Sequence, residues 1–287
     1  MDFRFGHLAL LSPAASFAGW STLIGLGART RVPHVLRAPA YRAFARAVGA
    51  DLSEVELALG DYDTFGDFFA RKLKPGARPM PGDDNESALI APCDGVIAAS
   101  GVVTDGTLIQ AKGLNYRLAD LVVDETMSAR LDGGSYATIY LSPRDYHRVH
   151  APMSARIVAY DYVPGELWPV NPRVATTRDG LFTRNERVVI WLESPRAGSI
   201  AVVMVAATGV GNMHLAHRDL DTVQFRSAHE QRRIELDERG SQVRRGDELG
   251  AFRLGSTVVM VFEAGAAVLD AHVGASVRFG EQLGEVA

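Results

Sequence analysis

The chain has 287 residues, of which 47 % are hydrophobic and 22 % charged. This composition suits one large or two smaller folded domains and excludes disorder on a large scale. The single cysteine, Cys93, excludes an intramolecular disulfide and any metal centre that needs several thiolates, and it suits a reducing compartment. Residues 1–50 carry a charge of +5 against −9 for the remainder. A basic front end on an acidic body favours an anionic surface as partner, and the lack of further basic runs argues against nucleic acid.

The uncharged run of residues 8–26, LALLSPAASFAGWSTLIGL, comes closest to the pattern of a membrane span or a signal peptide. Pro13, several hydroxyl side chains and two glycines disfavour both. A small-residue cleavage site followed by a polar mature start is also missing. We therefore expect a segment that lies on or shallowly in a bilayer. Ordinary packing within the protein and a true span stay open as alternatives.

Apolar residues recur at helical spacing after Pro39 and predict a short basic amphipathic helix that ends at Gly49. Its apolar positions are Tyr41, Phe44, Ala45 and Val48, and Arg42 and Arg46 point to another face. We expect residues 1–75 to form a helical membrane-association region.

Two further start signals follow in this helical front. Ser53 and Glu56 have the spacing of a capping box, and Thr64 can cap a helix that runs to Leu73 before Pro75 stops it. The Pro- and Gly-rich stretch 74–87 then predicts a linker.

Short β-branched runs separated by glycine and polar turns begin at Ala88 and continue almost to the end of the chain. They predict a β-rich catalytic domain over residues 76–287. The fold class is therefore α+β, with a β-rich sandwich or flattened barrel as body and amphipathic helices at the N-terminus. VRRGDELG at 243–250 recurs as VRFGEQLG at 277–284, which predicts two hairpins that reuse one turn.

Three segments contain residue types that could carry chemistry, and each could also be purely structural. APCDGV places Asp94 in a proline- and glycine-flanked turn. LSPRDYHRVHAP holds His147 and His150, which could be core, metal-bound or acid–base histidines. LGST by itself indicates only a turn at Ser256. Together, an aspartate, a histidine and a serine can activate a hydroxyl nucleophile, although the pattern Gly-x-Ser-x-Gly of ordinary serine hydrolases is absent around Ser256.

A serine that directly follows a glycine can attack the carbonyl group of that glycine. Gly255 has no side chain to block the approach of the Ser256 hydroxyl, and it tolerates the strained backbone that the attack requires. The resulting N-to-O acyl shift makes an ester, β-elimination cuts the chain, and the former serine becomes a pyruvoyl group. The apolar run after Ser256 would then hold a buried cofactor.

Seven blocks of the sequence, in register, resemble the phosphatidylserine decarboxylases. They are FFARKLKPGARPM (68–80), APCDGVI (91–97), LIQAKGLNY (108–116), YLSPRDYHRVHAPM (140–153), VPGELWPVN (163–171), LFTRNERV (181–188) and FRLGSTV (252–258). The Leu-Gly-Ser-Thr sequence is similar to the cleavage site of the membrane-associated bacterial type. The family more often has a small apolar residue at the position of Cys93.

The resemblance implies a self-processing proenzyme that converts phosphatidylserine to phosphatidylethanolamine and carbon dioxide. Its covalent pyruvoyl group, formed from Ser256, would make a Schiff base with the substrate amine. Asp94 and His150 would form the charge relay that deprotonates Ser256, with cleavage between Gly255 and Ser256. The chains 1–255 and 256–287 would stay associated, and pairing of protomers into a homodimer is left open.

His147 is our candidate for the acid that protonates the former α-carbon after carbon dioxide leaves. Candidate cations for the lipid phosphate are Lys112, Arg184 and Arg187, each of which could equally be a structural charge. No metal is expected. The substrate lies in an anionic membrane, so we expect a peripheral protein on the cytoplasmic side of the cell membrane.

Two other functions remain as alternatives. A zinc-dependent hydrolase on a β-sandwich would use His147, His150 and Asp94 as ligands, although His-x-x-His outside a helix is weak support. A non-enzymatic, carrier-like module is suggested by the paired hairpins, but neither hairpin holds a lysine suited to carry a swinging arm.

Overall fold

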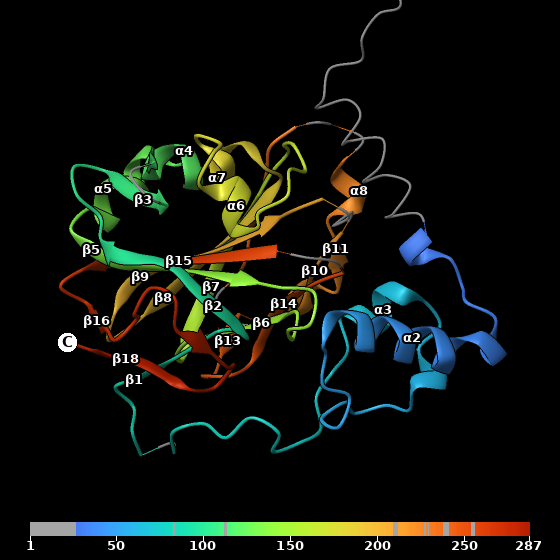
Figure 1. Cartoon of the computed structure of the whole chain (residues 1–287). Coiled ribbons are helices and arrows are strands. Elements are labelled where there is room, and N and C mark those ends of the chain that lie inside the picture. The colour runs from blue at the N-terminus through green and yellow to red at the C-terminus, as the bar shows by residue number, and fades with distance from the viewer. Residues whose placement is uncertain are drawn as a thin grey trace, which may run out of the picture.

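The structure is a computed structural model that describes residues 27–82, 84–111, 114–208, 212–226, 228, 230–237, 241–253 and 256–287. A small helical part at the front is joined by an extended linker to a large β-rich body (Figure 1). The uncharged run 8–26, for which we expect membrane contact, lies outside the described residues. No helix in the described part of the chain is long and apolar enough to cross a membrane.

The helical part forms a small core of its own, built mainly from aromatic rings. Its elements are α2 (His34–Val48), the 3-10 turn η1 (Leu59–Asp61) and α3 (Phe65–Phe69). The ring of Tyr41 stacks on that of Phe68 with centroids 4.5 Å apart, and both side chains are buried. Aromatic pairing of this kind gives a short helix such as α3 the tertiary support that it needs.

Local signals set some helix boundaries here and fail at others. Gly49 ends α2 in the left-handed conformation and Thr64 caps α3, accepting a hydrogen bond from the N–H of Asp67 at 3.1 Å, as predicted. The expected start of α2 after Pro39 is wrong, because the helix begins at His34. Pro39 therefore lies inside α2, where it lacks the N–H that would otherwise bond to the carbonyl of Val35.

The other predicted start signal is also wrong. Ser53 begins no helix, since its N–H donates to the side chain of Asp51 at 2.8 Å. Helix α3 ends at Phe69 and does not reach Leu73, which forms an isolated β-bridge with Val55.

A nine-stranded sheet forms the centre of the body. Along the sheet the strands are β12 (Arg232–Glu235), β7 (Ala155–Val163), β8 (Arg187–Ser194), β9 (Gly198–Ala206), β15 (Ser256–Ala264), β5 (Gly134–Leu141), β2 (Gly95–Val102) and β17 (Ser276–Val277), with β13 (Gln242–Val243) also paired to β7. The pairs within it are antiparallel. Strand β15 therefore lies in the middle, between β9 and β5.

Helices and a hairpin cover one face of this sheet (Figure 1). They are β3 (Thr107–Ala111), β4 (Leu114–Arg117), α4 (Leu118–Val122), α5 (Glu125–Leu131), α6 (Pro172–Ala175) and α7 (Leu181–Arg184). The hydroxyl of Tyr136 in β5 accepts a hydrogen bond from the N–H of Ile109 at 3.1 Å. Tyr136 and every second residue of β5 counted from it therefore point to the face of the sheet that the hairpin covers.

Two small sheets lie against the opposite face. One contains β11 (Leu220–Asp221), β10 (Met213–Leu215), β14 (Glu248–Phe252) and β6 (Arg148–His150), and the other β1 (Ala88–Ile90), β18 (Gln282–Val286) and β16 (Ala267–Leu269). The 3-10 turn η2 (Ala216–Arg218) and helix α8 (Val223–Arg226) flank β11. The α+β, β-rich class is thus confirmed, and within the described residues the main sheet stays open, so the body is a sandwich and not a barrel.

The two sequence repeats form the same turn, as predicted. Gly246 and Gly280 have φ angles of 87° and 89°, in the left-handed region that favours glycine. The N–H of Gly246 donates to the carbonyl of Ala151 at 2.9 Å, and the N–H of Gly280 donates to that of Ala91 at 3.1 Å. A Cβ atom on either glycine would lie within 2.8 Å of the Met80 side chain. The linker therefore packs between the two turns.

Candidate active site

Ser256 begins the central strand of the main sheet. It lies directly between Leu141 of β5 and Ala206 of β9 in the strand register. Its side chain is fully buried, and its Oγ has no hydrogen-bond partner among the described residues. An unpartnered hydroxyl in such a place is a candidate reactive group, because buried polar atoms are nearly always bonded.

The side chain of Ser256 faces the four-stranded sheet. Val258, on the same face, lies opposite Met204 of β9, and the Met204 sulfur lies 3.1 Å from where a Cβ on Gly250 of β14 would stand. Since alternate residues of a strand share a face, Ser256 points to the same side as Met204. The interior between the two sheets therefore contains the serine hydroxyl.

His147 precedes β6 and lies on the side of the four-stranded sheet that faces this interior. Its carbonyl accepts a hydrogen bond from the N–H of Phe252 at 2.9 Å, which continues the pairing of Arg148 with Ala251 and of Val149 with Gly250. Alternation places His147 on the same face as Val149 and Gly250.

The surroundings of His147 keep its imidazole neutral. Its Nδ1 lies 2.9 Å from the carbonyl of Asp145, the ring of Phe69 packs on it at 4.2 Å, and Nε2 has no partner among the described residues. Burial lowers the pKa of His147 to about 3. A neutral ring that donates Nδ1–H to Asp145 leaves Nε2 as a proton acceptor.

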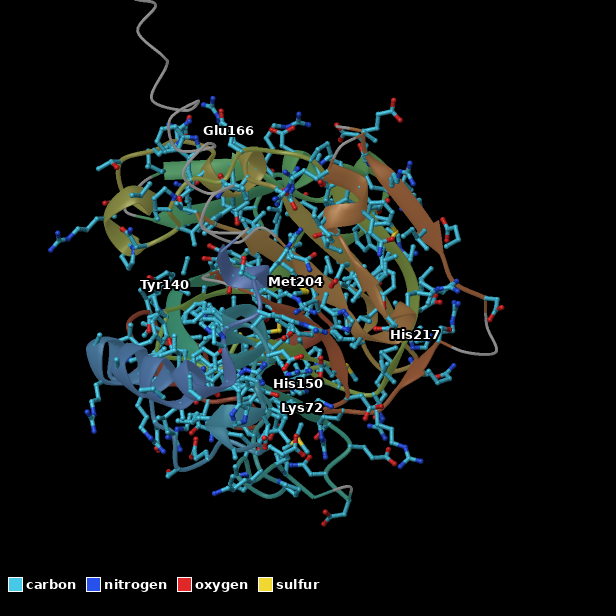
Figure 2. All side chains as sticks on the ribbon, turned by 90° about the vertical axis from the view of Figure 1, so that its right-hand side faces the viewer. Lys72, Tyr140, His150, Glu166, Met204 and His217 are labelled. Carbon is cyan, nitrogen blue, oxygen red and sulfur yellow. The ribbon has the colours of Figure 1, made fainter. Side chains whose placement is uncertain are left out.

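His150, at the end of β6, has partners at both ring nitrogens. Nδ1 lies 2.8 Å from the carbonyl of Gly246, and Nε2 lies 3.0 Å from the hydroxyl of Tyr146. The ring stacks on that of Phe279 with centroids 3.7 Å apart. Burial lowers the pKa of His150 to about 4, so this imidazole is neutral at physiological pH. In Figure 2 His150 lies below Met204 of the main sheet, on the side of the two small sheets.

Asp94 lies just before β2 and is held by a buried arginine from the linker. Arg78 donates to the two carboxylate oxygens from Nε at 3.2 Å and from Nη2 at 2.6 Å, and its Nη1 donates to Glu54 at 2.7 Å. The N–H of Phe279 also donates to Asp94, at 2.8 Å. A charged, bidentate pair of this kind fixes the orientation of the carboxylate.

Phe279 thus connects Asp94 and His150, through its N–H and its ring respectively. The described contacts of Asp94 and His150 include no hydrogen bond between the two side chains and none to Ser256. Gly255, the other half of the expected cleavage site, lies outside the described residues.

Cavities open on both sides of the helical part. One of about 270 Å³ is lined by Asp94, Tyr146 and four arginines, which are Arg71, Arg78, Arg144 and Arg278. Another of about 510 Å³ lies between α3 and the four-stranded sheet and is lined in part by Arg148 and Arg253. Arg253, which lines the larger cavity, is two residues before Gly255 in the chain.

The three cations expected at the lipid phosphate have different surroundings. Arg187 is buried and donates to the carbonyls of four residues, which are Leu121, Thr183, Asn185 and Asp120. Arg184 is half exposed, with its Nε 3.6 Å from Glu166. Lys112 lies outside the described residues. Arg187 therefore supports the backbone, and Arg184 is the better placed of the two described arginines to meet a ligand.

The zinc alternative requires three converging ligands. Within the described residues no group of three or more histidine, cysteine, aspartate or glutamate side chains is arranged to hold a metal ion. Asp94 is paired with Arg78, and each histidine has the partners given above.

Sequence reasoning missed Arg78, Phe279 and Arg71 as supports of the site. Arg71 is buried and its Nη2 donates to the carbonyl of Arg144 at 3.0 Å, which holds the turn before His147. Both arginines lie in the block at 68–80, whose family resemblance was the available signal. The signal for Phe279 was its place in the second repeat, where it occupies the position that Arg245 has in the first repeat.

A comparison with known proteins gives the same family from several sources. A protein-family model described as phosphatidylserine decarboxylase matches residues 65–285. The chain is 47 % identical over 272 residues to a phosphatidylserine decarboxylase proenzyme of Anaeromyxobacter sp. (strain K), covering 93 % of this chain and 94 % of that protein. It is 40 % identical over 289 residues to the proenzyme of the same name from Myxococcus xanthus, covering 99 % of both. The chain therefore belongs to the phosphatidylserine decarboxylase family.

Proposed function

We propose that this protein is a self-processing phosphatidylserine decarboxylase, a carboxy-lyase that forms phosphatidylethanolamine and carbon dioxide. One observation carries the proposal beyond family membership: Ser256, which follows Gly255 in the family's cleavage sequence, is buried and its hydroxyl has no partner among the described residues. That hydroxyl would be the nucleophile that cuts the chain.

Self-cleavage starts when Ser256 Oγ loses its proton and attacks the carbonyl carbon of Gly255. The new C–O bond replaces the C–N bond, which leaves an ester and a free amine on residue 256. Removal of the α-proton of residue 256 then expels the carboxylate of Gly255, and addition of water with loss of ammonia leaves a ketone. Chains 1–255 and 256–287 result.

Asp94 and His150 are the groups that we assign to this proton transfer. A base must be neutral to accept the serine proton, and the lowered pKa of His150, caused by burial, supports that state. Asp94 would stabilise the protonated ring. The two residues already share Phe279 as a neighbour, which contacts Asp94 through its N–H and His150 through its ring.

The pyruvoyl group formed from Ser256 would supply a carbonyl that condenses with the substrate amine and accepts the electron pair released by decarboxylation. Residues around it fit this chemistry, since a buried, unpartnered Oγ marks the position and the imidazole of His147 faces the same interior.

His147 would move the proton that the reaction needs. Its Nε2 accepts a proton from the ammonium group of the substrate and returns it to the α-carbon after carbon dioxide leaves. Replacement of His147 by alanine is expected to leave self-cleavage intact and to reduce decarboxylation. Normal cleavage together with a wild-type rate of decarboxylation would rule out this role.

The front of the molecule is suited to reach a lipid that stays in an anionic, cytoplasmic-facing membrane surface. Val35 and Leu36 of α2 are exposed apolar residues, 80 % and 54 % accessible, next to the basic residues of the same helix. Arg184 and Lys112 would contact the lipid phosphate. Flotation with vesicles that contain phosphatidylserine, compared with neutral vesicles, tests this part: equal binding to both would contradict it.

The experiment that tests the proposed function is an intact mass measurement of the purified wild type beside Ser256→Ala. We expect two chains in the wild type, split after Gly255, with a ketone in place of the amine of residue 256, and one uncut chain of 31.0 kDa in the variant. An uncut wild type that still decarboxylates phosphatidylserine would overturn the pyruvoyl mechanism.

A further inference from the structure

Glu186 is a buried acid that the mechanism above does not use. It is 2 % exposed, and its Oε2 accepts two hydrogen bonds from Arg226 of α8, at 2.9 Å from Nε and 2.6 Å from Nη2. Its other oxygen, Oε1, is the one carboxylate oxygen in the described part of the chain that is buried without a hydrogen-bond partner. Oε2 is therefore held by Arg226, and Oε1 is left available to accept a hydrogen bond from another group.

The strand register places Glu186 next to the start of β15. Its carbonyl accepts a hydrogen bond from the N–H of Ala206 at 2.8 Å, which continues the pairing of Arg187 with Val205. Ala206 in turn lies opposite Ser256. Glu186, Ala206 and Ser256 thus lie at one level on one face of the sheet. Neighbouring strands are about 4.8 Å apart, so the Cα atoms of Glu186 and Ser256 are about 10 Å apart.

Only the methyl group of Ala206 separates the two side chains across the sheet. A glutamate side chain reaches beyond the Cβ of its neighbour, so Oε1 can extend past the methyl group of Ala206 toward residue 256. On the opposing sheet, His147 faces the same interior, and its Nε2 is also without a partner in the described residues. Three unpartnered polar atoms therefore border one buried region.

The backbone around Glu186 is rigid. Asn185 is fully buried, and its side chain bonds to Trp168 N–H and to the carbonyls of Trp168 and Ala206. Arg187 is buried and bonded to backbone carbonyls on the opposite face. These contacts fix Glu186 in position before any ligand arrives, which reduces the entropy lost on binding.

A carboxylate in this place selects the charge of its ligand. The headgroup of phosphatidylserine carries a phosphate, a carboxylate and an ammonium group, and only the ammonium is attracted to Glu186. We propose that Glu186 Oε1 binds the ammonium group of the substrate and thereby brings its nitrogen to residue 256. This inference rests on the proposed function, and it makes Glu186 a substrate-binding residue that sets the orientation of the headgroup.

A purely structural role would end with the pair that Glu186 forms with Arg226. Such a pair would explain the burial of Oε2, but it leaves Oε1 desolvated without a hydrogen-bond partner in the described residues. Burial raises the pKa of Glu186, and Arg226 acts in the opposite direction. An ammonium ligand would satisfy the second oxygen and favour the charged form of the acid.

The test compares Glu186→Gln with Glu193→Gln, a matched control at the other end of β8, where Glu193 pairs with Arg156. Each protein is first checked by intact mass for two chains. Borohydride then reduces the ketone to an alcohol, so that an amine can bind but cannot condense. Calorimetric titration follows with glycerophosphoserine and with glycerophosphoglycerate, in which a hydroxyl group replaces the amine.

The wild type and Glu193→Gln should bind the amine compound at least about tenfold more tightly than the hydroxyl compound, as expected for one charge-assisted contact. Glu186→Gln should bind the two compounds equally. If Glu186→Gln is cut normally and keeps the tenfold preference, the inference is overturned while the proposed function stands. If the wild type lacks the ketone, the proposed function itself fails.

A second measurement needs no variant and so covers the case in which Glu186→Gln does not fold. The reduced wild type is titrated from neutral to acidic pH. Arg226 and Arg29 are the charged groups whose fields act on Glu186, and neither loses its charge in this range. Protonation of the Glu186 carboxylate should remove the preference for the amine and leave the affinity for glycerophosphoglycerate unchanged. A preference that persists until the protein unfolds would contradict the role of Glu186.

Discussion

The two repeated turns share a backbone and differ in the side chain at their third position. In the first turn Arg245 donates to backbone carbonyls of the linker, among them Pro81 at 3.0 Å and Gly82 at 2.7 Å. In the second turn Phe279 stacks on His150. One turn therefore fastens the linker, and the other supports the candidate site.

The similarity extends to the residue that each turn bonds. The N–H of Arg245 donates to Ser154 Oγ at 3.1 Å, and the N–H of Phe279 donates to Asp94 at 2.8 Å. Ser154 and Asp94 each follow an Ala-Pro pair by two residues. Accepting this hydrogen bond is thus the common, structural task of both side chains. The negative charge of Asp94 is therefore present in one copy only.

The largest effect is expected from replacing that charge with the side chain of the other copy. Asp94→Ser can still accept the Phe279 N–H, but it cannot stabilise a protonated His150. We expect self-cleavage to slow by about a thousandfold or more, as when the acid of a catalytic triad is lost. Electrophoresis of the chains with time after synthesis measures the rate. Ser154→Ala is the control, and equal cleavage in both variants would end the distinction between the copies.

The next effect concerns Arg78, whose guanidinium pairs with both Asp94 and Glu54. Arg78→Met leaves two largely buried carboxylates without their cation, and we expect the free energy of unfolding to fall by about 3 kcal/mol. Denaturant unfolding of the uncut Ser256→Ala chain measures it. Arg144→Met removes a pair with Asp145 in which the arginine side chain is 57 % exposed, and it should cost less than about 1 kcal/mol. Equal losses of the free energy of unfolding in the two variants would contradict a stabilising role of Arg78 beyond that of a surface ion pair.

Acid should destabilise the side of the molecule that holds the histidines. The folded pKa values of His147 and His150 are lowered to about 3 and about 4, from 6.5. At a pH between the folded pKa of each histidine and 6.5, the unfolded chain binds a proton that the folded chain does not. The free energy of unfolding therefore falls as the pH decreases below 6.5. Each histidine should contribute about 1.4 kcal/mol per pH unit.

Unfolding by denaturant at several pH values measures this slope. The variant His150→Gln should have a shallower dependence than the uncut parent chain, since it removes one of the two groups. An unchanged slope would mean that His150 does not remain neutral in the folded protein.

The smallest effect should be shared equally by the two turns. Gly246→Ala and Gly280→Ala each force a side chain into a left-handed backbone and toward Met80, and we expect each to lower the free energy of unfolding by about 1–2 kcal/mol. Thermal unfolding of the two variants gives the comparison. Combining either with Met80→Ala should recover part of the loss by removing the contact. A large difference between the variants would mean that the turns are not equivalent.

Local signals could be predicted from the sequence because neighbours in the chain decide them. Gly49 and Thr64 mark helix ends through their own backbone preferences, and the repeated turns follow from glycine and an acid at fixed spacing. The start of α2 could not be predicted in this way, because the turn before Pro39 is held by a contact distant in sequence: Arg37 Nη1 donates to the carbonyl of Gly60 at 3.0 Å.

The candidate site needed information that no local pattern contains. The residues Asp94, His147, His150 and Ser256 came from chemistry and family resemblance. Their partners depend on the strand order, in which β15 lies between β9 and β5 although it is the last of the three in the chain. That order places Glu186 level with Ser256. The contact of Arg78 with Asp94 depends instead on the linker, which packs between the two turns.

The central place of β15 also has a consequence during protein synthesis. Both of its neighbours, β5 and β9, are made earlier and must wait for it with unpaired edges. Cleavage therefore cannot precede the arrival of residues 256–264, and an unfinished chain holds its apolar strands open to other chains. A chain that stops at residue 255 should sediment as an aggregate. Self-cleavage can therefore begin only after β15 has been synthesised, because the strand that contains the reactive serine is also the one that completes the sheet.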